Sequence, residues 1–380
     1  MFNKRIKNLK AKIKKEKLDA VFISSVLNIF YLSGFTNFSK DEREAYIFIG
    51  KNFGYIITDG RYSESIIKQV PHLKLFERGH QKTVENLFKK HKKEIISLGI
   101  EEDSLTVAEF KAVKKHFKSI KHFNVSHLRS IKTQKELERI EEACRIGDLA
   151  FKNILGKIKV GVSEKEIAGE LEKFIKENGA QPSFPTITAF GKNSSIPHHQ
   201  TGDAILGEKV GQFILIDMGV KYKNYCSDMT RTIFFGKPSK KQRKMYAIVL
   251  EAQQKAVDFI NKAIRSSKQI KAKDVDRVAR DYIKSQGFST IPHSLGHGIG
   301  LEVHESPHLS PKSKDELKMG MIFSIEPGIY IPDFGSPRST RLATKRTRVE
   351  AGGVRIEDLF LLEKSGLKQL TNSAKELFSV

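Results

Sequence analysis

Four carboxylates and one histidine lie in segments of the chain whose other residues are mostly apolar or small. They are Asp217 in "ILIDMG", Asp228 in "YCSDMT", Glu326 in "FSIEPGIY", Glu357 in "GVRIEDLFLL" and His297 in "HSLGHGIG". A buried carboxylate is costly unless it is hydrogen-bonded, paired or bound to a metal. Any one of the five could be a satisfied core residue, but four negative charges together need a positive partner that the same strands do not supply.

A pair of divalent metal ions is the partner that this set of residues predicts. Asp217 and Asp228 are eleven residues apart, and "KYKNY" between them can turn the chain, so both carboxylates can reach one face of a hairpin. Oxygen ligands with a single imidazole suit Mn²⁺ and accommodate Zn²⁺, Co²⁺ or Fe²⁺. Two such ions about 3.5–4 Å apart can share a hydroxide and polarise a carbonyl, which is the chemistry of hydrolysis.

A second metal motif is present in letters only. "HESPH", from His304 to His308, satisfies the H-E-x-x-H pattern of zinc peptidases. That pattern binds zinc only when both histidines share one face of a helix, and Pro307 in a loop-like stretch disfavours the helix. We therefore do not expect a zincin site.

The elements that must position these residues fall into two parts. Up to about residue 130, helical and strand patterns alternate, which predicts an α/β layer domain. A long amphipathic helix then follows a capping box at Thr133 and Glu136, and further helices follow Ser163 and Ser239. Strand-like runs at 212–220, 229–235, 321–331 and 353–362 come in blocks, which predicts an α+β second domain over residues 131–380.

One segment differs from the rest in composition. "SPRSTRLATKRTRVEA", residues 336–351, holds four arginines in a chain that otherwise uses lysine. It is expected to be an exposed insertion between two strands. A nuclear-import or nucleic-acid patch is the alternative.

The whole-chain composition narrows the classes of partner. With 39% hydrophobic and 29% charged residues, the 380-residue chain is globular, and its net charge of +23 is mostly scattered lysine, so we expect no nucleic acid partner. No apolar run is long enough for a membrane span. The basic start lacks the features of a secretory signal, although an organelle presequence is an alternative. Cys144 and Cys226 have no paired spacing, which favours a reducing, cytoplasmic location.

The five residues, in the chain order Asp217, Asp228, His297, Glu326 and Glu357, resemble the ligand set of the pita-bread metallopeptidases, the family of methionine aminopeptidase, Xaa-Pro aminopeptidase and Xaa-Pro dipeptidase (prolidase). The words "SDMTRT", "GHGIGLEVHE", "IEPGIY" and "GGVRIED" carry this resemblance. "LDAVFISSVLNIFYLSGF" and "GYIITDGRYSES" resemble the amino-terminal domain of the creatinase branch, which methionine aminopeptidases lack. The resemblance implies a smaller creatinase-like α/β domain over residues 1–130 and a pita-bread catalytic domain over 131–380.

The resemblance also implies roles for individual residues. Asp217 would be a terminal ligand of one metal, and His297 with Glu326 would bind the other. Asp228 and Glu357 would bridge both metals, and Glu326 would also exchange a proton with the bridging water. Beside the metals, three histidines would contact the substrate or the tetrahedral intermediate, and these are His198, His293 and His304. His199 is expected to be a bystander. Arg355 is expected to orient metal-site carboxylates, with a simple salt bridge as the alternative.

The function predicted first is that of a Xaa-Pro aminopeptidase, which cleaves the amino-terminal Xaa-Pro bond of peptides with a metal-bridging hydroxide and forms a homodimer. Xaa-Pro dipeptidase (prolidase) is the alternative with the same metals. A non-catalytic protein on the same fold, using the basic surface to hold nucleic acid or an acidic partner, is a more distant one. The departure from the family is the segment 336–351, which could misplace Glu357 if it disturbed the ends of the adjoining strands.

Overall fold

The computed structural model describes residues 1–39, 41–207, 211–332 and 351–376, and the chain divides into two compact units, Met1–Arg129 and Ser130–Val380. Of the predicted basic insertion 336–351, all but Ala351 lies outside the described residues. No helix among the residues described has both the length and the apolar character that a bilayer span requires.

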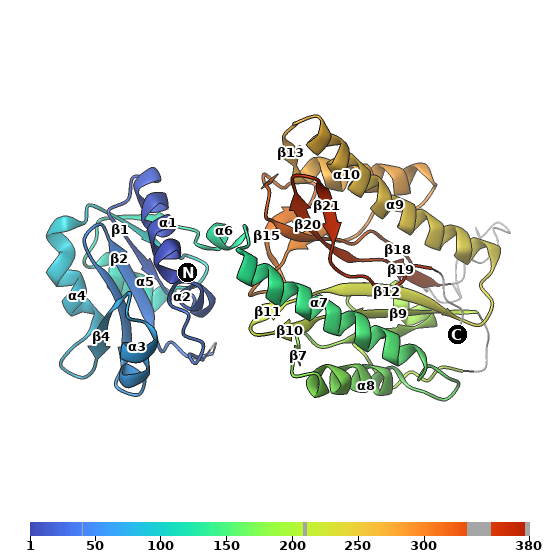
Figure 1. Ribbon diagram of the computed structural model, residues 1–380, viewed down its shortest axis with the longest axis horizontal. Helices are drawn as coiled ribbons and strands as arrows, with labels where there is room; N and C mark the ends of the chain where they lie inside the picture. The colour runs from blue at the N-terminus through green and yellow to red at the C-terminus, as the bar shows by residue number, and fades with distance from the viewer. Residues whose placement is uncertain (40, 208–210, 333–350, 377–380) are drawn as a thin grey trace, which may run out of the picture. The chain divides into compact units, whose positions relative to one another are not determined.

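The first unit is an α/β layer structure around one mixed sheet (Figure 1). The sheet has the strand order β4-β3-β2-β1-β5-β6, and β1 pairs antiparallel with β2 and parallel with β5. Its central strands read "AVFI" and "YIFIG" and are buried along their whole length, as expected for strands covered on both faces. The strands are β1 (Ala20–Ile23), β2 (Tyr46–Gly50), β3 (Gly54–Asp59), β4 (Lys74–Arg78), β5 (Ser97–Ile100) and β6 (Ser119–His122). The helices are α1 (Phe2–Lys15), α2 (Val26–Ser33), α3 (Ser63–Gln69), α4 (Val84–His91), α5 (Val107–Lys114) and α6 (Ser126–Arg129), with the 3₁₀ turn η1 (Lys92–Glu94).

The second unit is α+β, as predicted. Its helices are α7 (Gln134–Leu155), α8 (Glu164–Glu177), α9 (Lys240–Arg265) and α10 (Ala272–Ser285), with the 3₁₀ turn η2 (Gly191–Ser195). Its strands are β7 (Gln181–Pro182), β8 (Ile187–Phe190), β9 (Gln212–Met218), β10 (Val220–Tyr222), β11 (Tyr225–Cys226), β12 (Met229–Phe235), β13 (Ile270–Lys271), β14 (Gly296–Gly298), β15 (Glu305–Leu309), β16 (Glu316–Leu317), β17 (Ile322–Ile325), β18 (Gly328–Ile331), β19 (Gly352–Arg355), β20 (Asp358–Glu363) and β21 (Gly366–Gln369).

Two helix pairs enclose the strands of the second unit (Figure 1). Strands β12, β9 and β8 form one sheet, and α7 and α8 pack on it through a core that includes Ile140, Leu171 and Ile216. The other face of β9 and β12 contributes Phe213 and Phe234 to a second core, which α9 and α10 share with β17 and β20. The strands are therefore held between two apolar layers, and the polar side chains at their ends have fixed positions.

The helix starts predicted from capping boxes are confirmed. At α8 the Ser163 hydroxyl accepts a hydrogen bond from the backbone N–H of Glu166, and Ser239 does the same for Gln242 at α9. A capping box at Thr133 begins α7. Each box satisfies backbone donors that the first turn of a helix leaves free, which fixes where the helix begins.

Three of the predicted strand-like runs each contain two strands with a short break between them. The run 212–220 contains β9 and β10, 321–331 contains β17 and β18, and 353–362 contains β19 and β20. The residues between the paired strands include Glu326 and Glu357, whose backbone N–H groups bond to Leu295 and Thr230 outside those strands. The breaks turn these glutamates out of the sheets.

Strands β18 and β19 flank the segment that the sequence identified as an insertion. They pair directly, with Ile331 opposite Gly352 and Gly328 opposite Arg355. The two strands on either side of the segment are therefore in register, and Glu357 lies two residues after the end of β19.

Candidate metal centre

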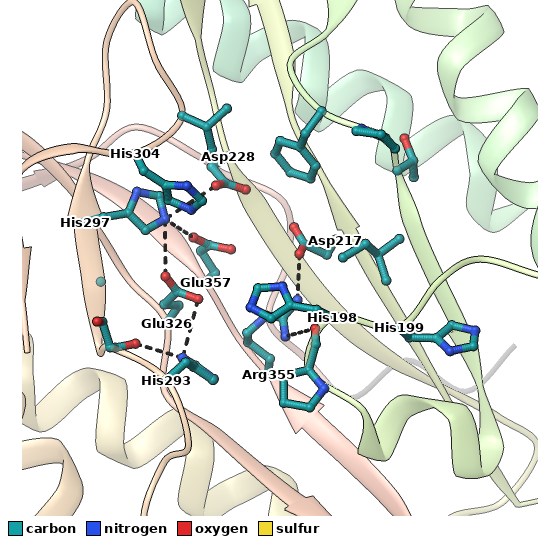
Figure 2. Close-up of a pocket in the computed structure, with 18 of the residues that line it drawn as sticks. His198, His199, Asp217, Asp228, His293, His297, His304, Glu326, Arg355 and Glu357 are labelled. Atoms are coloured by element: carbon teal, nitrogen blue, oxygen red, sulfur yellow. Dashed lines mark hydrogen bonds and ion pairs between the residues drawn. The ribbon is translucent and has the colours of Figure 1, made fainter. Parts of the chain in front are cut away.

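All the residues predicted to do chemistry line one cavity of about 950 Å³ in the second unit (Figure 2). Its walls include Asp217, Asp228, His297, Glu326, Glu357, His198, His293, His304 and Arg355. Residues separated by as many as 159 positions in the chain thus meet at one place. A cavity of this size is typical of small-ligand sites.

The two aspartates come from the antiparallel pair β9 and β12. Asp217 lies opposite Thr230, one step before the end of β9, and Asp228 directly precedes β12. Between them the chain reverses at Lys223 and Asn224, which both have left-handed backbone angles, φ 45° and 71°. The hairpin anticipated from "KYKNY" thus carries both carboxylates toward the cavity.

His297 is the centre of the carboxylate group (Figure 2). Its Nε2 lies 3.3 Å from Glu326 Oε1, 3.6 Å from Asp228 Oδ2 and 3.9 Å from Glu357 Oε1. One ligand atom from each of Asp228, His297 and Glu357 falls within 4.8 Å of the others, and all three residues are buried. This is the spacing of side chains that could share a metal ion.

Arg355 connects the opposite side of the cavity to β9. Its Nη2 donates to Asp217 Oδ2 at 2.6 Å, and its Nη1 donates to the Tyr330 hydroxyl and to the Pro197 carbonyl, each at 3.0 Å. Its Nε donates to Thr230 Oγ1. The guanidinium therefore holds one oxygen of Asp217 in place and leaves the other, Oδ1, facing the cavity.

The donor set fits divalent metal ions. Three buried carboxylate oxygens at the cavity have no hydrogen-bond partner among the described residues, and they are Asp217 Oδ1, Asp228 Oδ1 and Glu357 Oε1. Buried polar atoms are nearly always satisfied, so three orphaned oxygens at one cavity call for a ligand. Among the described residues that line the cavity, Arg355 is the one permanent cation, against four carboxylates. Bound cations would offset that imbalance, and carboxylates with imidazole are suitable ligands for them.

Burial shifts the pKa values of these groups in directions set by their neighbours. It raises the pKa of Asp228 well above its ordinary range, and the charges of Glu357 and Asp217 add to this. It also raises the pKa of Glu357 to about 8, with Glu326 and Asp217 acting in the same direction. Burial alone would lower the pKa of His297, but the adjacent Glu326 raises it to about 9. Conversely, His297 outweighs burial at Glu326 and lowers that pKa to about 2. Without metal, one ion pair and protonated carboxyls share the space.

Three further histidines face the same cavity. His293 Nε2 lies 2.9 Å from the Tyr330 hydroxyl, and the ring of His304 packs edge-on against His297 with 4.3 Å between centroids. Burial lowers the pKa values of both His293 and His304, so both are neutral at pH 7. His198 points toward Arg355 and Asp217 in Figure 2. Neutral imidazoles can donate to or accept from a bound peptide.

His199 lies beside His198 but points away from the metal ligands (Figure 2). Its Nε2 lies 2.8 Å from Glu164 Oε2. The cavity-lining His308 belongs to strand β15, so the H-E-x-x-H residues share no helix.

Sequence reasoning did not identify Tyr330 or the apolar side of the cavity. Tyr330 contacts both His293 and Arg355, and burial raises its pKa to about 12, which keeps the hydroxyl protonated. Of the motif "EPGIY", only the glutamate was considered as a site residue, although the tyrosine of the same motif is Tyr330. Phe184, Ile187 and Val303 supply an apolar wall. Their scattered positions gave no pattern.

Comparisons with known proteins extend over the whole chain. Residues 138–364 match metallopeptidase family M24, and residues 5–131 match the creatinase/prolidase N-terminal domain. A protein named Xaa-Pro dipeptidase from Pyrococcus furiosus is 36% identical over 384 residues, which cover 98% of this chain and 99% of the relative. The structure of a Xaa-Pro dipeptidase from Bacillus anthracis matches with a TM-score of 0.87 at 34% identity and covers 100% of both chains. The structure of an X-Pro aminopeptidase from Thermotoga maritima matches with a TM-score of 0.77 at 31% identity and covers 96% of this chain and 98% of that one.

Proposed function

The chain belongs to metallopeptidase family M24, and from this premise we propose that it is a Xaa-Pro dipeptidase, which splits a dipeptide at the bond before proline. Its second unit has the pita-bread fold of the family, and its first unit is a creatinase-type amino-terminal domain. The observation that carries the proposal is the cluster of buried carboxylates around His297 with three unsatisfied oxygens. The dipeptidase names of the relatives support the choice of substrate.

In this proposal two divalent ions, with Mn²⁺ as the first candidate, are held by the five residues of the cluster. Asp217 would hold one ion, His297 with Glu326 would hold the other, and Asp228 and Glu357 would serve both. When bound, such ions supply a nucleophile at neutral pH and polarise the scissile carbonyl. Arg355 orients Asp217 through the bond at 2.6 Å.

The remaining groups act on the peptide itself. His198, His293 and His304 bind and orient it, and the apolar wall at Phe184, Ile187 and Val303 takes its apolar surface. An Xaa-Pro bond is a tertiary amide without an N–H, so its nitrogen must gain a proton to leave as proline. Glu326 is the carboxyl that we assign to this proton transfer.

Xaa-Pro aminopeptidase was predicted first from the sequence, and the comparisons favour the dipeptidase alternative instead. The relatives named Xaa-Pro dipeptidase are 36% and 34% identical to the chain, and the X-Pro aminopeptidase is 31% identical. The two activities differ in whether the site accepts a residue beyond proline. A non-catalytic role is disfavoured because carboxylate or imidazole occupies all five ligand positions.

The test uses protein stripped with a chelator and reloaded with Mn²⁺. It is offered the dipeptide Ala-Pro, the tripeptide Ala-Pro-Ala and the proline-free dipeptide Ala-Ala. We expect alanine release from Ala-Pro alone, and its loss in Asp228→Asn, which keeps the side-chain volume but removes a ligand charge. Asp203→Asn, at a solvent-exposed acid, is the matched control and should retain full activity. Cleavage of the tripeptide would assign the aminopeptidase, and no cleavage of either proline peptide would refute both.

A further inference from the structure

Glu164 is a fully buried carboxylate that the metal centre does not use. It follows Ser163 in the first turn of α8 and is 0% exposed. Its Oε1 accepts hydrogen bonds from the Phe190 backbone N–H and the Asn193 amide, both at 2.8 Å. Its Oε2 accepts from the backbone N–H of Gly202 at 3.1 Å and contacts His199 Nε2 at 2.8 Å. One side chain thus holds both ends and the middle of the loop 190–202.

That loop delivers two groups to the metal centre. The carbonyl of Pro197 accepts a hydrogen bond from Arg355, which in turn donates to Asp217. The next residue, His198, faces the cavity (Figure 2). A displacement of the loop would therefore move a substrate-facing imidazole and an acceptor of Arg355 together.

His199 is the one basic side chain in contact with Glu164 among the residues that the structure describes. The pair is well shielded, with 13% of the His199 side chain and none of the Glu164 side chain exposed. Consecutive histidines in this loop thus point in different directions (Figure 2). A buried carboxylate needs its full complement of donors, so the loss of one is costly.

The stretch beyond the loop is held independently of His199. The backbone N–H groups of Glu164 and Lys165 donate to the carbonyls of Ala204 and Gly202. Lys165 and Asp203 also form an ion pair at 2.8 Å, but 59% and 85% of their side chains are exposed. Such an exposed pair contributes little. Thr201 Oγ1 anchors the end of the loop, since it accepts from the Thr188 N–H and donates to the Thr186 carbonyl, both at 2.9 Å. Between Ser195 and Thr201, His199 is therefore the side-chain attachment of the described stretch that carries His198.

We infer that His199, through its contact with buried Glu164, is a positioning residue that holds His198 and the Pro197 carbonyl at the metal centre. The inference rests on the proposed function for its kinetic consequence only. His199 also borders the cavity, but its Nε2 contacts Glu164, and in this assignment it binds neither the metals nor the substrate. The sequence predicted that His199 is a bystander, and this inference instead gives it a positioning role.

The test compares His199→Leu, which removes the donor at similar volume, with His199→Gln, whose amide can place an N–H near the position of Nε2. We expect kcat/KM for Ala-Pro to fall roughly 30- to 100-fold in the leucine variant, since small misplacements of active-site groups have effects of that size. The glutamine variant should recover most of this loss, and Asp203→Asn should equal the parent.

Two readouts separate positioning from general damage. In a His198→Ala background, His199→Leu should lower kcat/KM at least five-fold less than it does in the parent, because His198 is gone and only the Pro197 carbonyl remains to be positioned. Hydrogen exchange in His199→Leu should be faster at loop 190–202 and unchanged in α9. Additive losses in the double variant, or unchanged exchange at the loop, would overturn the inference. Because exchange needs no substrate, it decides the question even if Ala-Pro is not cleaved, in which case the proposed function alone fails.

Discussion

The metal-free protein should lose stability as the pH rises from 5 to 8, because its buried carboxylates have raised pKa values. The pKa of Glu357 is raised by burial to about 8 from an ordinary value of 4.5, so the folded protein keeps a proton that the unfolded chain has released. Stability falls with pH wherever the folded state binds more protons. Burial raises the pKa values of Asp217 and Asp228 too, which act with the same sign.

His297 contributes in the same direction. Its pKa rises to about 9 from 6.5, so its ion pair with Glu326 stabilises the protein fully below pH 6.5 and is lost as the pH rises through 9. The lowered pKa of Glu326, about 2, gives stability that is lost only as the pH falls below its ordinary range. Between pH 5 and 8 none of the five candidate metal ligands opposes the trend. The lowered pKa values of His293 and His304 oppose it in part, because the unfolded imidazoles bind protons that the folded ones do not.

The contribution of Glu357 to this loss of stability can be calculated. For each pH unit over which the unfolded chain has lost this proton and the folded protein has kept it, the unfolding free energy falls by about 1.4 kcal/mol. With partial titration at both ends of the range, the fall from pH 5 to pH 8 is about 3.5 kcal/mol. For a unit of this size, each kcal/mol lowers Tm by about 2–4 °C, which gives a decrease of roughly 7–14 °C. Mn²⁺ at 100 times its Kd should restore about 2.7 kcal/mol at pH 8.

The measurement is calorimetry of chelator-treated protein at pH 5, 6.5 and 8, with Glu357→Gln as the test variant and Asp203→Asn as the control. Glutamine cannot ionise, so Glu357→Gln should lose the share of the Tm decrease that Glu357 contributes, roughly 7–14 °C, while Asp203→Asn should keep the full decrease. Added Mn²⁺ should raise Tm most at pH 8, where the ligands release their protons most readily. A metal-free Tm that is constant or rises from pH 5 to 8 would refute the assignment of the buried charges.

Two further predictions concern side chains and backbone around the centre. Arg355→Ala leaves Asp217 buried without its partner and should cost about 3–5 kcal/mol of unfolding free energy in urea titrations. Arg355→Lys should cost less stability but still lower Ala-Pro turnover at least tenfold. The reason is that one ammonium cannot reproduce the four hydrogen bonds of the guanidinium. Equal stability of the alanine variant and the parent would contradict this. Gly296→Ala would place a Cβ 1.9 Å from the Ser324 carbonyl oxygen and should cost about 3 kcal/mol, while Gly169→Ala, with open space inside α8, should stabilise by about 0.5–1 kcal/mol. Thermal unfolding of both variants measures the contrast, and a neutral Gly296→Ala would show that the backbone there can move apart.

Local sequence signals were sufficient for the elements whose causes are local. The capping box at Thr133 predicted the start of α7, because the donors and acceptors involved are three residues apart. Asp217 in β9 and Asp228 just before β12 were identified as candidates because charged residues are rare in buried strands. Both judgements need only neighbouring residues, so one sequence is enough to make them.

The interrupted strands show where such signals end. Glu326 and Pro327 separate β17 from β18, yet the run reads as continuous because its flanking residues remain apolar. What breaks it is the bond from the Glu326 N–H to the Leu295 carbonyl, a partner 31 positions away, together with the missing N–H of Pro327. A long-range partner of this kind leaves no local pattern, and neither does the meeting of Tyr330 with His293.

Glu164 illustrates the same limit in a different way. An acidic residue in the first turn of a helix usually faces water and interacts with the helix dipole. Glu164 stands in that position of α8, so its sequence context predicts an exposed residue, but it is completely buried. Its four partners come from residues 26 to 38 positions further along the chain.

Buried acids outside the carboxylate cluster hold each of the three loops that carry a cavity-lining histidine. Glu164 holds the loop of His198, as described above. Asp276 of α10 accepts from the Leu295 N–H, and its partner Arg280 donates to the His293 carbonyl itself.

The third case is Glu305, which is buried beside Lys132 and accepts from the backbone N–H groups of Leu301 and Glu302, next to His304. Burying a charge merely to gain stability is a poor exchange, since an apolar side chain would serve as well. A charge that bonds several backbone donors does, however, fix a loop that has no regular secondary structure. The recurrence of this arrangement behind all three histidines is therefore best understood as a requirement of loop geometry at the site, imposed on residues that never touch the substrate.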